Sequence, residues 1–249
     1  APLGGSALML AALAERREQT GDDAYDGTMR ALGRFLVAMQ RASGDFYVYA
    51  YPGSGNVDED AISQYFAGEA MWALARLQRA LPDPRWRRAA ERAAHFISVE
   101  RDDTDFVPVP PLNDHWAAYG FAEMADWPLA GDAAGYARRL YGRFHVLIRW
   151  DAQAEAGAPF STTHTSGKRA AALGTWVEGQ AALTRLARAD DRLADLADDA
   201  LASTRCGAAV LVARQRGGAW YTGGETRMDD QQHAISGLLA LADLLEGNE

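Results

Sequence analysis

The sequence is poor in cysteine and in basic residues. Cys206 is the single cysteine, so no disulfide can form within the chain, and its apolar neighbours mark it as a small buried side chain. Only 25 Lys and Arg stand against 34 Asp and Glu, which gives a formal net charge of −9. Because phosphate binding needs a basic face, we predict that nucleic acid is not a partner.

Long apolar runs are also missing. None reaches the roughly 20 residues that a spanning helix needs, so we predict no membrane-spanning segment. The chain begins at Ala1 without a methionine, and no export signal is visible. We therefore leave localisation open, with a secreted or periplasmic protein that has lost its leader preferred over a cytoplasmic one. Residues 1–249 are expected to form one domain, on its own or within a longer chain.

Several common site motifs are absent from the sequence. There is no His-x-x-x-His, Glu-x-x-His or Cys-x-x-Cys cluster, so we expect no metal site. The glycines from Gly53 to Gly55 have no preceding strand and no following phosphate-binding lysine, which argues against a nucleotide cofactor. No Gly-x-Ser-x-Gly elbow is present, which lowers the case for a serine hydrolase. We expect no cofactor.

The sequence does contain four similar helix starts. The stretches GDDAY, PDPRW, GDAAGY and RADDRL each place an aspartate shortly before a large side chain. An aspartate at this position can cap free backbone N–H groups at the start of a helix. The four aspartates lie at intervals of 61, 49 and 58 residues, which fits two helices and their loops per repeat: Asp22, Asp83, Asp132 and Asp190.

A second series of segments lies between these capped helices and is poorer in charge. It comprises GGSALMLAALAE, SQYFAGEAMWALARL, NDHWAAYGFAEM, LGTWVEGQAALTRL and DDQQHAISGLLALADLL. Helices that are apolar nearly all round fit an inner layer, whereas the capped helices carry a charged outer face. We therefore predict an all-α fold of about nine helices, five of them inner, arranged as a ring of helical hairpins or as an open solenoid. Extended segments are expected only in loops, at 45–51, 105–110 and 218–224.

One stretch supports a resemblance to known helical rings. RALGRFLVAMQRASGDF, residues 30–46, resembles the glutamine-tryptophan motif of squalene and hopene cyclases, with Gln40, Gly44 and Phe46 at the motif positions. A looser copy covers residues 208–220. The hairpin pattern over the chain resembles the (α/α) toroid proteins, which include six-hairpin glycosidases, polysaccharide lyases, sugar epimerases and terpene cyclases. This resemblance implies an (α/α) toroid or partial toroid, in which the motif joins an outer helix to the next turn.

In helical toroids the inner helices start at one rim, so we look for the site at those starts. Tyr65, Glu69 and Trp72 share one helix face by their spacing. We predict Asp114 and Glu178 as acid and base, with Asp230 as a substitute for either. The predicted substrate-binding residues are Tyr65, Glu69, His115, Trp116, Tyr119, His164, Trp176, Gln232 and His233. The alternatives are helix capping for Asp114 and Asp230, and an arginine partner for Glu69.

These residues favour a carbohydrate as the partner. A glycoside hydrolase needs a protonated and an ionised carboxyl group across the bond, and the inner-helix starts supply several candidates. A uronate lyase or epimerase would instead use a Tyr or His base with a polar or cationic group: Asn113, His115, Tyr119, His164 and Arg169 fit this role. A toroid that only binds a glycan or a protein is a further alternative, and a terpenoid cyclase is the most distant one. Any protein partner stays open.

Overall fold

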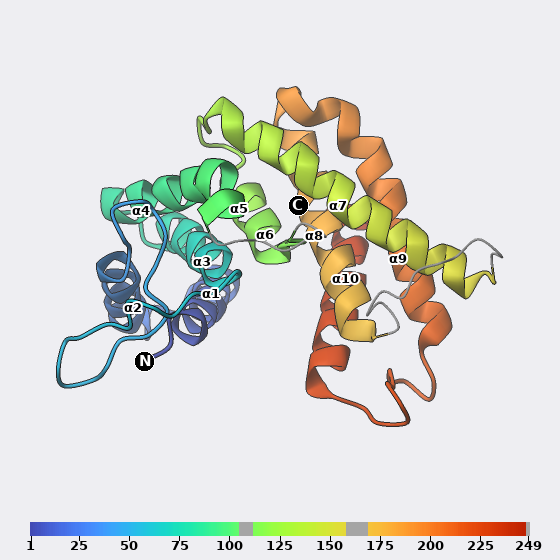
Figure 1. Ribbon diagram of the computed structural model, residues 1–249, viewed down its shortest axis with the longest axis horizontal. Coiled ribbons are helices and arrows are strands. Elements are labelled where there is room, and N and C mark those ends of the chain that lie inside the picture. Colours follow the sequence, from blue (N-terminus) through green and yellow to red (C-terminus); the bar gives the residue numbers. More distant parts are fainter. Residues whose placement is uncertain (105–111, 158–168, 248–249) are drawn as a thin grey trace. The chain divides into compact units, whose positions relative to one another are not determined.

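The protein is mainly helical in the part of the chain that a computed structural model describes, residues 1–104, 112–157 and 169–247 (Figure 1). Within these ranges β pairing is limited to isolated bridges in loops. The predicted all-α fold is confirmed. The chain divides into two compact units, Ala1–Tyr136 and Ala137–Glu249.

Unit 1 contains three helices of the charge-poor series and two of the capped series. Its elements are α1 (Leu3–Thr20), α2 (Asp26–Ala38), α3 (Phe66–Ala80), α4 (Pro84–His95), the π-helix η1 (Phe96–Glu100), α5 (Arg101–Thr104) and α6 (His115–Glu123). The helix α7 (Gly131–Glu155) begins in this unit and continues into unit 2. Unit 2 adds α8 (Ala170–Ala189), the 3₁₀ helix η3 (Asp191–Leu196), α9 (Ala197–Arg214) and α10 (Met228–Glu246). Cys206 on α9 is exposed, so the prediction that it is buried is wrong.

The predicted helix starts are met to different degrees. Asp83 caps α4 by accepting a hydrogen bond from the Arg85 backbone N–H at 2.8 Å, and Asp190 caps η3 in the same way. Asp132 lies in the first turn of α7. Asp22 differs, because α2 begins only at Asp26. Its carboxylate accepts from the Ala24 N–H at 2.9 Å, and this local turn replaces a helical one.

The inner helices of unit 1 run in the same direction. α3 contacts α1, α2, α4 and α6, which explains why a sequence with so few charges is stable there. A Cβ atom at Gly68 would lie 2.8 Å from the Ala117 nitrogen, and one at Gly120 would contact Met71, so α3 and α6 are close and parallel. Gly4 packs on Glu69 at the start of α3. The first turns of α1, α3 and α6 therefore lie at one end of the unit.

Unit 2 repeats this arrangement around α8, which is buried along most of its length and contacts α9, η3 and α10. A Cβ at Gly174 would lie 2.8 Å from the Ala234 nitrogen, and one at Gly237 would lie 3.2 Å from Val177, so α8 and α10 are parallel. In each unit a charge-poor helix, α3 or α8, is thus buried among its neighbours. The arrangement of the helices in inner and outer layers, and their closure into a toroid, remain predictions.

Gln40 connects two outer helices of unit 1. Its side-chain nitrogen donates to the Gly44 carbonyl at 3.0 Å and to the Ala89 carbonyl of α4 at 2.9 Å. Gly44 has a φ of 100° and its Cα lies against the Arg92 carbonyl, where a side chain would collide. Phe46 is buried. The glutamine-glycine-aromatic stretch therefore fixes the end of α2 on α4, which is a structural role.

The membrane prediction has a counterpart in the structure. Among the described residues, none of the helices combines the length and the apolarity that crossing a membrane requires.

Candidate functional site

The residues predicted from the sequence fall into two groups, one in each unit. Unit 1 holds Tyr65, Glu69, Asp114, His115, Trp116 and Tyr119, and unit 2 holds Trp176, Glu178, Asp230, Gln232 and His233. His164 lies outside the described residues. Each group is considered within its own unit.

Glu69 is a buried carboxyl group near the start of α3. Its side chain packs on Gly4 of α1, and among the described residues its Oε2 atom has no hydrogen-bond partner. Burial raises the pKa of Glu69 to about 7, and the negative charge of Asp114 adds to the effect. Among the described residues, Glu69 does not have the arginine partner that was one of the alternatives. Arg76 of the same helix pairs instead with Glu15 and Glu18 of α1. Glu69 is therefore protonated to a large extent at neutral pH.

Aromatic rings lie on the same part of unit 1. The Trp72 ring stacks with Trp116 at a centroid distance of 5.5 Å and with Tyr119 at 5.2 Å, and all three side chains are partly exposed. Tyr65 is 40% exposed one turn before Glu69. Trp116 and Tyr119 are also 5.9 Å apart, so the rings from α3 and α6 form a compact cluster on the face of the helix that carries Glu69. The spacing in the sequence placed Trp72 on the face of Glu69, but its contact with α6 required the fold.

Asp114 has a structural role. It caps α6 by accepting from the Ala117 N–H at 3.1 Å, and its other oxygen pairs with Arg101 at 2.5 Å. Both side chains of this pair are fully buried, and the Arg101 guanidinium also lies 5.6 Å from the centre of the Tyr136 ring. The capping alternative is therefore the one that the contacts support. His115 follows as the first residue of α6, with its ring 4.3 Å from that of Trp116.

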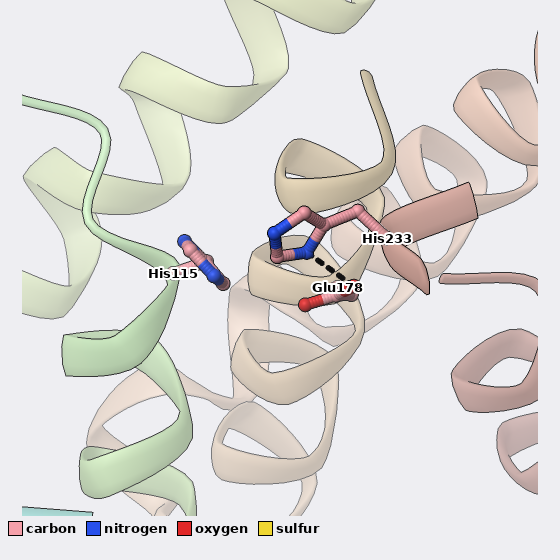
Figure 2. A group of neighbouring side chains, drawn as sticks. All are labelled: His115, Glu178 and His233. Atoms are coloured by element: carbon pink, nitrogen blue, oxygen red, sulfur yellow. Dashed lines mark hydrogen bonds and ion pairs between the residues drawn. The ribbon is translucent and has the colours of Figure 1, made fainter. Parts of the chain in front are cut away.

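Glu178 and His233 form a hydrogen-bonded pair in unit 2. The Nδ1 atom of His233 on α10 lies 3.0 Å from Oε1 of Glu178 on α8, as Figure 2 shows. Glu178 is 1% exposed, so the carboxylate that fixes the His233 ring is buried. Nε2 of His233 lies 3.5 Å from Asp229, which is largely exposed. The ring thus has one nitrogen fixed by a buried acid and the other directed to an accessible one.

Charged groups surround this pair at the start of α8. Arg169 lies 3.2 Å from Asp229 and 3.5 Å from Asp230. Asp230 is fully buried and accepts from the Ala171 N–H at 3.0 Å, so it caps α8 from the neighbouring helix α10. Trp176 is buried, whereas Gln232 is exposed and lies 3.3 Å from Ser236. Capping is again the alternative that the contacts of Asp230 support.

A separate cavity of about 290 Å³ lies between α4 and the start of α7 in unit 1. Its walls are mainly small apolar side chains, with Glu91, His95 and Asp132 as the ionisable groups. None of the catalytic or substrate-binding residues predicted from the sequence and described in the structure lines this cavity. His95 is exposed, and the cavity has neither a buried acid nor a cluster of rings. The region of Glu69 is therefore the stronger candidate site.

Two features of these sites have no clear signal in the sequence. Arg101 stands in a short charged segment, and nothing in its spacing identifies it as the partner of Asp114. Asp229 and Asp230 are neighbours in the sequence, yet one contacts the histidine and the other caps a helix. Comparison with known protein families, with curated proteins and with solved structures finds no match to this chain, so the candidate site is supported by its own geometry.

Proposed function

We propose that this protein is a carbohydrate-active enzyme that hydrolyses glycosidic bonds, with Glu69 as the proton donor. The observation that supports this is the buried carboxyl group whose pKa is raised to about 7. Departure of an alcohol from a sugar needs a proton, and a carboxyl group protonated near neutral pH can supply it. The proposal replaces Asp114 by Glu69 as the acid, because both oxygens of Asp114 are occupied in a buried pair.

The aromatic rings of Trp72, Trp116 and Tyr119 indicate the class of substrate. A sugar ring has apolar C–H faces and polar edges, and it packs well on an aromatic face that is itself partly in water. Trp72 lies on α3, the helix that carries Glu69, and Trp116 and Tyr119 lie on α6, which packs on α3; all three rings are partly exposed.

The test compares Glu69→Gln with the unchanged protein on a panel of polysaccharides, with products read by mass. We expect products heavier by water, and a loss of turnover in the variant of about 10²-fold or more. An aryl glycoside with a good leaving group should be affected much less, because its departure needs no proton. Activity should also fall as pH rises through 7, since Glu69 then ionises.

The matched control is Glu15→Gln, which makes the same chemical change on the neighbouring helix α1. It removes an ion pair with Arg76 and should leave turnover close to that of the unchanged protein. Equal loss in both variants, or full activity in Glu69→Gln, contradicts the assignment of Glu69.

A second candidate function is supported by unit 2. His233, fixed by Glu178 at 3.0 Å, has the arrangement of a general base, and Arg169 is a cation nearby. Such a base would remove the proton next to a uronate carboxyl group, as a lyase or epimerase does. A lyase would give unsaturated products with no added water, and His233→Gln would abolish them. Products of that kind decide for this candidate and against hydrolysis.

A further inference from the structure

Three tyrosines alternate with less exposed side chains in the loop that follows α2. Side chains alternate along extended chain, and here Phe46 and Val48 are buried at 3% and 4% exposure. The odd-numbered positions hold Tyr47, Tyr49 and Tyr51, of which Tyr49 is 44% and Tyr51 is 52% exposed. We call these three residues the tyrosine ladder. Extended backbone at the bridged residues Tyr49 and Ala50 places Tyr51 about 6.6 Å along the chain from Tyr49.

The ladder is held by several contacts. Its backbone pairs with Pro2 at Tyr49 and with Val57 at Ala50, and the Asp58 N–H donates to the Tyr49 carbonyl at 3.0 Å. The Tyr51 hydroxyl lies 3.2 Å from the Asp58 carboxylate. The Arg41 guanidinium covers the Tyr47 ring at 4.3 Å. Rings that are positioned before binding lose less conformational freedom when a ligand packs on them.

The ladder lies at the end of unit 1 that holds Glu69. Tyr49 pairs with Pro2, the residue directly before α1, and the Leu3 N–H donates to the Val48 carbonyl at 2.9 Å. Gly4, the next residue of α1, packs on the Glu69 carboxyl group. A continuous path of contacts therefore joins the exposed rings to the buried acid within one unit.

The surroundings of the ladder restrict what can bind to it. The hairpin beside it carries Asp58, Glu59 and Asp60 with no basic residue from Pro52 to Tyr65, and Arg41, which covers the Tyr47 ring, is itself paired with Asp45. A polyuronate would be repelled by these charges, whereas a neutral glycan would find hydrogen-bond acceptors next to ring faces. The exposed residues from Gly53 to Asn56 are small or polar, and a protein interface would be expected to have an apolar centre.

We propose that the tyrosine ladder binds a neutral polysaccharide chain and that it forms an outer part of the substrate site. This inference deepens the proposed function and rests on it for the meaning of the site. It also decides between the two candidate substrates, because a neutral chain has no carboxyl group for a uronate lyase to act on.

The test measures binding by affinity electrophoresis in gels that contain a soluble neutral polysaccharide, with a polyuronate gel in parallel. The double variant Tyr49→Ala, Tyr51→Ala should bind the neutral polymer roughly tenfold more weakly, because two ring faces are lost. Tyr221→Ala is the matched control, since Tyr221 is 50% exposed and belongs to unit 2. Circular dichroism checks that each variant is folded.

Binding and turnover separate this inference from the proposed function. Glu69→Gln should lose turnover and still bind the neutral polymer, and the control Tyr221→Ala should keep both binding and turnover. The ladder inference is overturned by unchanged polymer binding in the double variant, by preferential binding of the polyuronate, or by no binding to any neutral polymer tested. A protein that binds the polymer through the ladder but shows no turnover contradicts the enzyme proposal alone.

Discussion

At the scale of single residues, the surroundings of a side chain decide its chemistry. Glu69 and Asp114 are both buried acids at the start of an inner helix. Burial raises the pKa of Asp114 as well, but Arg101 and a backbone N–H group oppose this rise by stabilising its charged form. The Oε2 atom of Glu69 has no such partner among the described residues, so burial favours its neutral form. The two acids are therefore suited to different roles.

The raised pKa of Glu69 predicts a pH-dependent stability difference. Below pH 4.5 Glu69 is protonated in both the folded and the unfolded protein, and its burial then has no ionisation cost. As pH rises to about 7, the unfolded state ionises first and stability is lost. At pH 8 the cost is about 3 kcal/mol, at about 1.4 kcal/mol for each pKa unit. Glu69→Gln removes this cost.

We expect Glu69→Gln to be more stable than the unchanged protein at pH 8 and similar to it at pH 4.5. Urea unfolding at several pH values measures the difference. The comparison isolates Glu69 because all other acids are common to both proteins. A difference that is constant with pH, or that grows toward low pH, would show that Glu69 is ionised in the folded protein.

At the scale of elements, glycine sets how closely the inner helices approach. A Cβ at Gly174 would meet only backbone atoms of α10, which cannot rotate away as a side chain can. The corresponding contacts of Gly68 are the Ala117 nitrogen and the Asp114 carboxylate. Gly68 directly precedes Glu69 in α3, and Gly174 lies one turn before Glu178 in α8. Close packing there brings His233 within hydrogen-bonding distance of Glu178.

Gly174→Ala should therefore destabilise unit 2, by about 1–3 kcal/mol or more, because the helices must separate. Gly142→Ala is the matched control, since Gly142 lies inside α7 of the same unit and a Cβ there would meet nothing within 4 Å. It should stabilise the helix by about 0.5–1 kcal/mol. Thermal unfolding followed by circular dichroism gives both values. Equal changes in the two variants would refute the role of close packing at Gly174.

At the scale of the whole molecule, charge restricts the partners more than the fold does. The protein has a formal net charge of −9. Many of its arginines are paired with acids on the surface, such as Arg138 with Asp195 and Arg192 with Asp190. Paired arginines contribute little positive potential beyond their own contact. The surface potential is expected to be negative over most of the protein.

We accordingly expect no binding to polyanions at physiological salt. Electrophoretic mobility shift with double-stranded DNA, and passage over immobilised heparin, measure this directly. Unchanged mobility and elution in the flow-through are the expected results. Salt-dependent retention on both materials would show a basic surface that the sequence does not reveal.

The fold class could be predicted from the sequence because it depends on local patterns. The five charge-poor segments became α1, α3, α6, α8 and α10, and the four capped segments became α2, α4, α7 and α9. Helical periodicity and capping depend on residues a few positions apart, so they can be recognised in a single sequence. The exact start of α2 was not predictable, since Asp22 forms a turn with Ala24 in place of a cap.

Which polar residues are functional could be predicted only in part. The sequence placed Glu69, Glu178 and His233 on charge-poor helices and Asp114 at the start of one, as the structure has them, but it ranked Asp114 above Glu69. The correct ranking depends on two contacts that the fold creates. Arg101 pairs with Asp114, and Gly4 packs on Glu69. The pairing of Glu178 with His233 likewise spans two helices.

The sequence by itself determined the helices, their two classes and the acidic character of the protein, because each follows from neighbours along the chain. The tertiary structure alone decided which carboxyl groups are compensated and which rings share a face. Burial and charge compensation depend on atoms brought together by packing, and a residue such as Glu69 acquires its pKa only when α1 and α3 are in contact.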